Sequence, residues 1–232
     1  MPSNMTKHES KAITALRRSV LFHGLPLAAL ARLAAESTAV NLPRGKHLHR
    51  SGGRPPGVYA VISGCFMLKA GTAVNSGKVI DLVAAGGHLC LAAVVLGTLE
   101  TMSAEALADS TLLLIPRSAL LECAADTPQL ALQLAKALGQ QVQSLIADIE
   151  GFSLHTGRER VADYLLQLAG SNGTQSSPFA LPAKKSVIAS RLSLTPEYFS
   201  RTLHDLILTG AIAVNGRQVT VLNSARLRQR DA

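Results

Sequence analysis

The segment from Lys185 to Leu222 constrains the fold most, because it joins two short helical patterns to a hairpin signal. Alternating residues flank Asn215-Gly216, and Asn-Gly in that setting is a strong signal of a two-residue β-hairpin loop. Before the hairpin, Thr195 can cap a helix whose first position is Pro196. Two short helices followed by a hairpin predict a winged helix-turn-helix.

Three polar residues share one face of the second helix in this motif. Glu197, Ser200 and Arg201 are spaced i, i+3 and i+4, so they project to the same side. Arginine can bind guanine, glutamate can accept from cytosine, and serine can bond to either kind of base edge. We therefore predict that these residues read DNA bases, the alternative being an ordinary surface ion pair between Glu197 and Arg201. Contacts with DNA phosphates are predicted for Lys184, Lys185, Arg191, Thr195 and Arg217.

The charge of the chain agrees with a polyanionic partner such as double-stranded DNA. The 232 residues carry a net charge of +8, and residues 151–232 hold 10 Lys and Arg against 5 Asp and Glu. The N-terminus lacks the apolar core of a signal peptide, and no apolar run approaches the ~20 residues needed to span a bilayer. Three widely spaced cysteines give neither a disulfide framework nor a zinc signature. We expect a cytoplasmic protein with no membrane partner.

The pattern of the chain divides it into three regions: 1–125, 126–153 and 154–232. Two helical stretches separated by Gly24 and Pro26 come first. From Thr38 to about Leu121, short β-type runs alternate with glycine-containing breaks, a pattern typical of a sandwich or small barrel. We therefore predict an α+β fold, in which a β-barrel sensor domain precedes a long helix and the C-terminal winged helix-turn-helix.

The long helix carries a candidate dimerisation seam. Thr127 or Asp126 can cap it, and Pro128 suits its first turn. Apolar residues then step by four and three, as in a coiled coil. This spacing predicts a homodimer, the alternative being a helix that packs on its own barrel. The predicted seam residues are Leu138, Val142, Leu145, Ile149 and Phe152.

Three further segments resemble the cyclic-AMP receptor protein / fumarate-nitrate reduction regulator (CRP/FNR) superfamily. Residues 59–64 (Tyr-Ala-Val-Ile-Ser-Gly) resemble its barrel motif, and residues 158–166 resemble its first DNA-domain helix. Residues 196–201 are similar to the recognition helix of the fumarate-nitrate and denitrification regulators, although Ser193 stands where many relatives have glycine. The resemblance implies a jelly-roll, cyclic-nucleotide-binding-like sensor, and a homodimer that reads palindromic TTGA-type half-sites. It also implies control by a small effector and contact with RNA polymerase.

The predicted sensor departs from two types of relative. Relatives that bind cyclic nucleotides hold the phosphate with Gly-Glu and Arg-Ser, whereas residues 90–92 are Cys-Leu-Ala and residues 102–103 are Met-Ser. An apolar wall cannot neutralise a phosphodiester, so we do not expect cyclic AMP. Iron–sulfur relatives need an N-terminal cysteine cluster, and no cysteine precedes Cys65. We expect no iron–sulfur cluster.

Haem is the remaining cofactor candidate. Residues 89–96 are wholly apolar, and on an extended strand His88 and Cys90 face the same side. Thiolate and imidazole are common haem ligands. The arrangement resembles that of the carbon-monoxide-sensing haem regulators, which use a cysteine near this position and an N-terminal proline. Cys90 and Pro2 would match these two residues. The histidine that those regulators have two residues after the cysteine is replaced here by Ala92. A structural cysteine beside a surface histidine, or another small apolar effector, are the alternatives.

A metal-dependent, cupin-like enzyme fused to a helical domain is the alternative function. His47 and His49 can share a face of a strand, but a metal needs further ligands. The glutamate expected a few residues later is absent, and we see no nucleophile–base arrangement. We expect both histidines to be solvated and the chain to be no enzyme.

Overall fold

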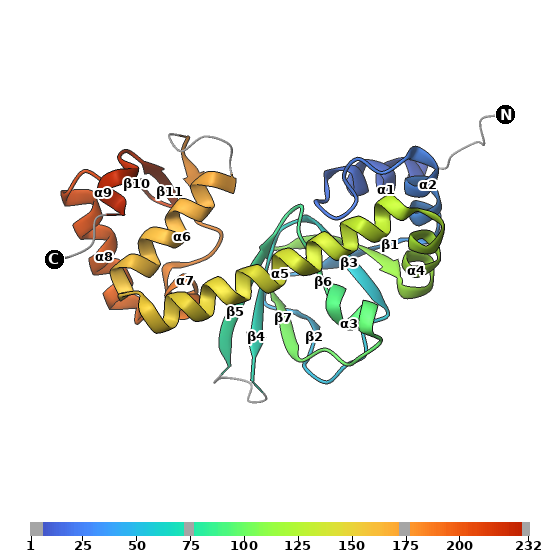
Figure 1. Ribbon diagram of the computed structural model, residues 1–232, viewed down its shortest axis with the longest axis horizontal. Helices are drawn as coiled ribbons and strands as arrows, with labels where there is room; N and C mark the ends of the chain where they lie inside the picture. The colour runs from blue at the N-terminus through green and yellow to red at the C-terminus, as the bar shows by residue number, and fades with distance from the viewer. Residues whose placement is uncertain (1–6, 72–76, 172–176, 229–232) are drawn as a thin grey trace. The chain divides into compact units, whose positions relative to one another are not determined.

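The computed structural model describes residues 7–71, 77–171 and 177–228 (Figure 1). Pro2, a candidate haem ligand, lies outside this part of the chain. The fold divides into two compact units, residues 1–142 and 143–232, and the division falls inside the long helix α5 (Pro128–Leu154). None of the described helices is both long and apolar enough to cross a membrane.

The first unit is built on two four-stranded antiparallel sheets rather than one closed barrel. Strand orders 1-8-3-6 and 2-7-4-5 are those of a double-sheet jelly roll. The first sheet contains β1 (Thr38–Leu42), β8 (Ser110–Pro116), β3 (Gly57–Ser63) and β6 (His88–Leu89). The second contains β2 (His47–His49), β7 (Met102–Ala106), β4 (Cys65–Ala70) and β5 (Lys78–Ala84). The predicted α+β, jelly-roll sensor is therefore confirmed.

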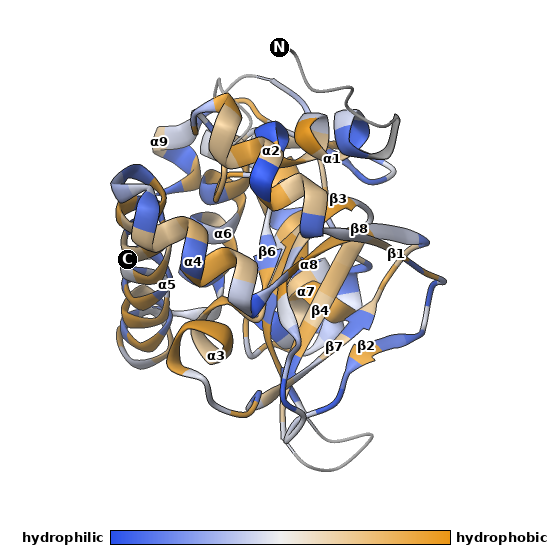
Figure 2. Ribbon diagram, turned by 90° about the vertical axis from the view of Figure 1, so that its right-hand side faces the viewer, coloured by the Kyte–Doolittle hydropathy of each residue, from blue (hydrophilic) through white to orange (hydrophobic). Residues whose placement is uncertain are grey.

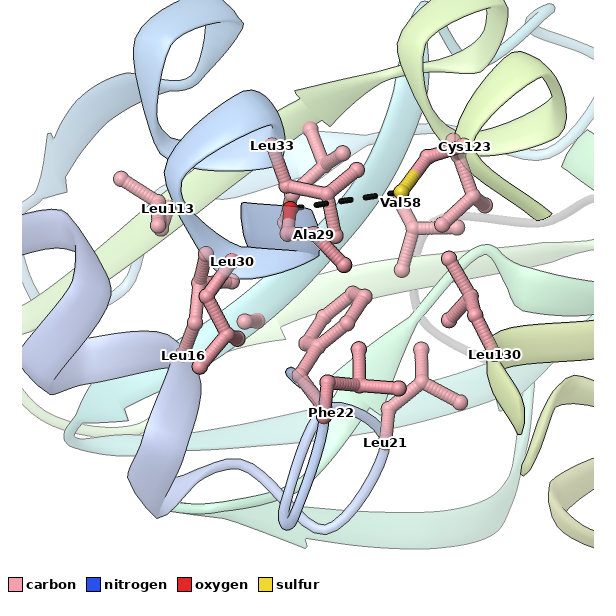
Figure 3. Close-up of a cluster of buried hydrophobic side chains, with 14 of the residues drawn as sticks. Leu16, Leu21, Phe22, Ala29, Leu30, Leu33, Val58, Leu113, Cys123 and Leu130 are labelled. Atoms are coloured by element: carbon pink, nitrogen blue, oxygen red, sulfur yellow. Dashed lines mark hydrogen bonds between the residues drawn. The ribbon is translucent and has the colours of Figure 1, made fainter. Parts of the chain in front are cut away.

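Helices cover one face of this jelly roll with a large apolar core. Phe22 and Leu30 are fully buried beside Val58 of β3 and Leu130 of α5 (Figure 3). The thiol of Cys123 donates a weak hydrogen bond to the carbonyl of Ala29, at 4.0 Å. The helices of the first unit, besides α5, are α1 (Lys7–Arg18), α2 (Leu27–Glu36), α3 (Leu91–Leu96) and α4 (Arg117–Asp126).

The prediction that His88 and Cys90 lie on one extended strand is wrong. Strand β6 ends at Leu89, and the apolar run that follows is the helix α3, orange in Figure 2. A short apolar run does not distinguish a buried strand from a buried helix. Cys90 joins the two elements with φ +67°, in the left-handed region. His88 pairs with Ala60 of β3, so His88 and Cys90 do not share a strand face.

The second unit holds the predicted winged helix-turn-helix. Its helices are α6 (Gly157–Ser171), α7 (Lys185–Arg191), α8 (Pro196–Leu208) and α9 (Ser224–Leu227), and its sheet has the order β10 (Ile212–Asn215), β11 (Gln218–Val221), β9 (Phe179–Ala180). The N-terminus of α6 is a capping box, in which the Thr156 amide donates to Glu159 at 2.7 Å and the Glu159 amide donates to the Thr156 hydroxyl at 3.3 Å. A Cβ at Gly157 would lie 2.6 Å from the Tyr198 ring, so glycine permits the close approach of α6 and α8.

Candidate nucleic-acid interface

The start of α8 is fixed by local chemistry that the sequence predicts. The side chain of Thr195 accepts a hydrogen bond from the Tyr198 amide at 3.2 Å, and Pro196 occupies the first helical position. Ser193, in the turn before α8, has φ +56°. This left-handed conformation favours glycine, which is consistent with the glycine that many relatives of the resembled family have at this position. The turn forms with serine at some backbone cost.

One face of α8 is exposed and the opposite face is buried. Phe199, Leu203 and Leu206 pack into the core of the second unit. Glu197, Ser200 and Arg201 are exposed, and none of them has a hydrogen bond or ion pair within the described part of the chain. The structure therefore places the three predicted base readers together, with their polar groups free to bind another molecule.

The hairpin after α8 supplies the predicted wing. β10 pairs with β11 in antiparallel register, and Gly216 in the connecting turn has φ +61°. Val219 and Val221 of β11 are buried and attach the hairpin to the core. Arg217 lies at the exposed turn, where one of its terminal nitrogens donates to the Leu181 carbonyl at 2.6 Å. The remaining guanidinium N–H groups can still reach a phosphate.

The candidate phosphate-binding residues are in two different environments. Lys184 and Lys185 are exposed at the start of α7, and Thr195 is exposed at the cap of α8. Arg191 is different, because it is only 9% exposed and one of its terminal nitrogens donates to both carboxylate oxygens of Asp148, at 2.7 and 3.0 Å. The prediction that Arg191 contacts phosphate is therefore wrong. The last turn of α7 faces α5, which directs this side chain inward.

A second arginine joins the same three helices. Arg160 of α6 donates to the Leu192 carbonyl after α7 and to the His155 carbonyl after α5, at 3.1 and 2.9 Å. Its guanidinium carbon lies 5.9 Å from the ring centroid of Phe152. Asp148 and Arg160 therefore bind the helix-turn-helix to the last turns of α5. Sequence reasoning missed both residues, since the Asp148–Arg191 and Arg160–Leu192 contacts join residues 43 and 32 positions apart in the chain.

The predicted seam is largely uncovered on α5. Val142, Leu145 and Ile149 are 56%, 45% and 65% exposed, and Phe152 is 37% exposed. Leu138 differs, because it is partly buried against the core of its own jelly roll. Leu138 stays a predicted seam residue, but part of its side chain already packs within its own chain. Apolar side chains exposed in a continuous helical stripe are typical of an interaction surface.

A partly enclosed cavity of about 190 Å³ lies beside α3 in the jelly roll. Three polar side chains meet there: His49 of β2, Cys90 before α3, and Glu100 before β7. The Cys90 Sγ lies 3.3 Å from Nε2 of His49, and Glu100 is 8% exposed beside the same thiol. The expectation that His49 is solvated is wrong, and this histidine, not His88, contacts Cys90.

The electrostatics of this cavity follow from burial. Burial raises the pKa of the Cys90 thiol, and the neighbouring Glu100 raises it further. Burial likewise raises the pKa of Glu100 and lowers the pKa of His49. Each of these shifts favours the uncharged form of the group. The site is polar but offers no cation, so it does not suit a phosphodiester anion.

Haem does not fit the described residues. His88 is partly buried at a separate position in β6, where burial lowers its pKa. The raised pKa of Cys90 disfavours the thiolate that would bind iron. The cavity is smaller than the ~300 Å³ at the lower end of sites for drug-sized ligands, and a haem is larger than most of these ligands. Within the described ranges, no group of three His, Cys, Asp or Glu side chains is arranged to hold a metal ion.

Comparisons with known proteins agree with this architecture. Residues 39–127 match the family model of the cyclic nucleotide-binding domain, and residues 159–230 match that of the Crp-like helix-turn-helix domain. The chain is 30% identical over 193 residues to the transcriptional activator protein Anr of Pseudomonas protegens, covering 80% of this chain and 77% of the relative. It is 26% identical over 221 residues to a CRP-like cAMP-activated global transcriptional regulator of Mycobacterium tuberculosis, covering 93% and 97%.

Among solved structures, FixK2 from Bradyrhizobium japonicum superposes with a TM-score of 0.76 at 24% identity, over 84% of this chain and 98% of that one. This likeness supports the fold. The identity to Anr, over most of both chains, and the two domain matches support the family. The jelly roll, the winged helix-turn-helix and these relatives together show that the chain belongs to the CRP/FNR superfamily of transcription regulators.

Proposed function

We propose that this regulator is a homodimer that reads palindromic DNA with TTGA-type half-sites. The observation that carries the proposal is the exposed face of α8. Glu197, Ser200 and Arg201 have no internal partner in the described chain, and the helix that presents them is capped at Thr195. Lys184, Lys185, Thr195 and Arg217 would contact phosphates around it.

Dimerisation follows from the exposed stripe of α5. Two copies that pair along Val142, Leu145, Ile149 and Phe152 present two α8 helices related by a two-fold axis. Half-sites one helical turn apart, about 34 Å, match such a pair. In this proposal residues 1–125 sense a signal, residues 126–153 dimerise and residues 154–232 bind DNA. We place the dimer in the cytoplasm and expect it to contact RNA polymerase, as a regulator of transcription would.

The effector of this proposal is small and carries no phosphate. The cavity lined by His49, Cys90 and Glu100 lacks a cation and is otherwise largely apolar. A small neutral molecule matches these properties better than cyclic AMP does. We assign no catalytic activity, because the relatives are transcription regulators.

Titration of labelled operator DNA tests the DNA-reading part of the proposal. We expect the purified protein to prefer a TTGA-type palindrome over a scrambled duplex. Arg201→Ala removes a bidentate contact with one base, so it costs about 1–3 kcal/mol, or roughly 5- to 150-fold in affinity, on the matched duplex only. Lys185→Ala, the matched control, weakens binding to both duplexes and lowers the salt slope by about one. Equal losses on both duplexes for Arg201→Ala would reject Arg201 as a base reader.

A further inference from the structure

The exposed face of α8 continues beyond the three predicted base readers. His204 follows Ser200 by four residues and Arg201 by three, and it is exposed. It lies seven residues after Glu197, and seven residues of an α-helix make about two turns, or about 10 Å. Glu197, Ser200, Arg201 and His204 therefore form one polar face along the helix.

The side chain of His204 makes no polar interaction that stabilises the described part of the chain. Its neighbours Leu203 and Leu206 are buried, whereas the imidazole has no hydrogen bond or ion pair among the described residues. Arg191 shows the opposite case, since Asp148 binds its guanidinium in the interior. His204 thus shares with the three predicted readers both its orientation and its free polar atoms.

The spacing between Arg201 and His204 along α8 is close to the spacing between neighbouring base pairs of DNA. Three residues separate it from Arg201, which is about 4.5 Å along the axis of α8. Neighbouring base pairs are about 3.4 Å apart. An imidazole always has at least one N–H donor, and the purine N7 and the guanine O6 are acceptors in the major groove.

We propose that His204 is a fourth base-reading residue, which donates to a purine, preferentially guanine, at a base pair next to the one that Arg201 contacts. This inference rests on the proposed function, because it requires α8 to lie in the major groove. It extends the recognition surface by one helical turn. The half-site of this regulator is then longer than three side chains alone would specify.

Selection of bound sequences from a randomised operator library tests this proposal. The preference of the wild type at the base pair beside the Arg201 position should fall about five- to tenfold in His204→Ala, the size expected for one lost base contact. Preferences at the other positions should stay. Gln140→Ala, an exposed change on α5 rather than on α8, is the control and should leave the selected motif unchanged.

Three other results of this selection would each contradict part of the proposal. An unchanged motif in His204→Ala would overturn the role of His204 as a reader while leaving that of Arg201 intact. Weaker binding to every sequence, with a smaller salt slope, would identify a phosphate contact instead and would likewise overturn it. A wild type that selects no motif at all would refute the proposed function itself, before His204 is reached.

Discussion

The recognition face of α8 and the cavity of the jelly roll use polar side chains in opposite ways. On α8, Glu197 and Arg201 face outward and bind nothing within the described chain. In the cavity, Cys90 contacts His49 at 3.3 Å, and Glu100 is buried beside it. A ligand of α8 needs to displace only water, whereas a ligand of the cavity must also replace internal contacts.

This difference has a consequence for regulation. A partner that binds preformed, exposed groups leaves the protein as it was, so α8 alone carries no switch. A ligand that breaks the Cys90–His49 contact shifts the elements that hold these residues, β2 and the start of α3. Such a ligand can bias one conformation over another, because its affinity for the two differs. Under the proposed function, the cavity is therefore the candidate site for the signal, and α8 is the candidate site for DNA.

The largest expected effect concerns the dimer, on which symmetric reading by α8 depends. Leu145→Glu removes one apolar side chain per copy, each worth about 1.5–3 kcal/mol when buried, and sets two carboxylates against an apolar seam. We expect monomers in sedimentation velocity and a loss of operator binding. Gln143→Glu, exposed on another face of α5, should remain dimeric. Dimers in the Leu145→Glu protein would show that α5 is not the pairing element.

The next effect concerns the attachment of the DNA-binding helices to α5. Asp148→Ala removes the carboxylate that accepts two hydrogen bonds from the nearly buried guanidinium of Arg191, and breaking a buried ion pair in this way costs about 3–5 kcal/mol. We expect urea unfolding to report this loss. Glu150→Ala, which removes an exposed carboxylate from the same helix, should change stability by less than about 0.5 kcal/mol. Similar unfolding curves for both variants would show that the Asp148–Arg191 pair does not stabilise the fold.

The two sites also differ in how far the sequence predicts them. The α8 face is local: the cap at Thr195, the helical period and the Asn215-Gly216 turn all lie within one short segment. Short-range spacing therefore predicts which side chains are exposed. The same spacing cannot show that the last residue of α7, Arg191, faces Asp148, because that contact spans 43 residues.

The cavity could not be predicted from spacing. His49 and Cys90 are 41 residues apart, and they meet only because β2 and the start of α3 are adjacent in the folded jelly roll. The left-handed conformation of Cys90 also turns its side chain away from the position that an extended strand would give it. No periodic pattern marks Glu100, which stands between Leu99 and Thr101 in a mixed polar and apolar segment. From the missing charges the sequence predicts that cyclic AMP is not the effector, but it does not identify the groups that line the cavity.

Replacing Glu100 of the cavity should change how the stability of the protein depends on pH. Burial raises the pKa of this carboxyl above its ordinary value of 4.5, so above that pH the unfolded chain ionises before the folded one. Stability of the wild type is then lost as pH rises from 4.5 through the folded pKa. Glu100→Gln lacks this loss. Its urea midpoint, relative to wild type, should increase from pH 4.5 to pH 7.

The exposed carboxyl of Glu36 on α2 provides the control for removing a charge. The comparison between Glu100→Gln and Glu36→Gln separates an effect of the cavity from a general change in net charge. A midpoint difference for Glu100→Gln that stays constant over this pH range would contradict the raised pKa of the Glu100 carboxyl. So would a difference that decreases with rising pH.

The smallest effect concerns the turn that orients α8. Ser193 has φ +56°, and a left-handed conformation costs a residue other than glycine about 1–2 kcal/mol. Glycine removes this cost but increases the entropy of the unfolded chain, so Ser193→Gly should stabilise the protein by no more than about 1 kcal/mol. Ser190→Gly, inside α7, should instead destabilise by about 0.5–1 kcal/mol. Opposite signs for two Ser→Gly changes three residues apart would locate the strain in the turn. Destabilisation by both would show that the side chain of Ser193 contributes more than its backbone costs.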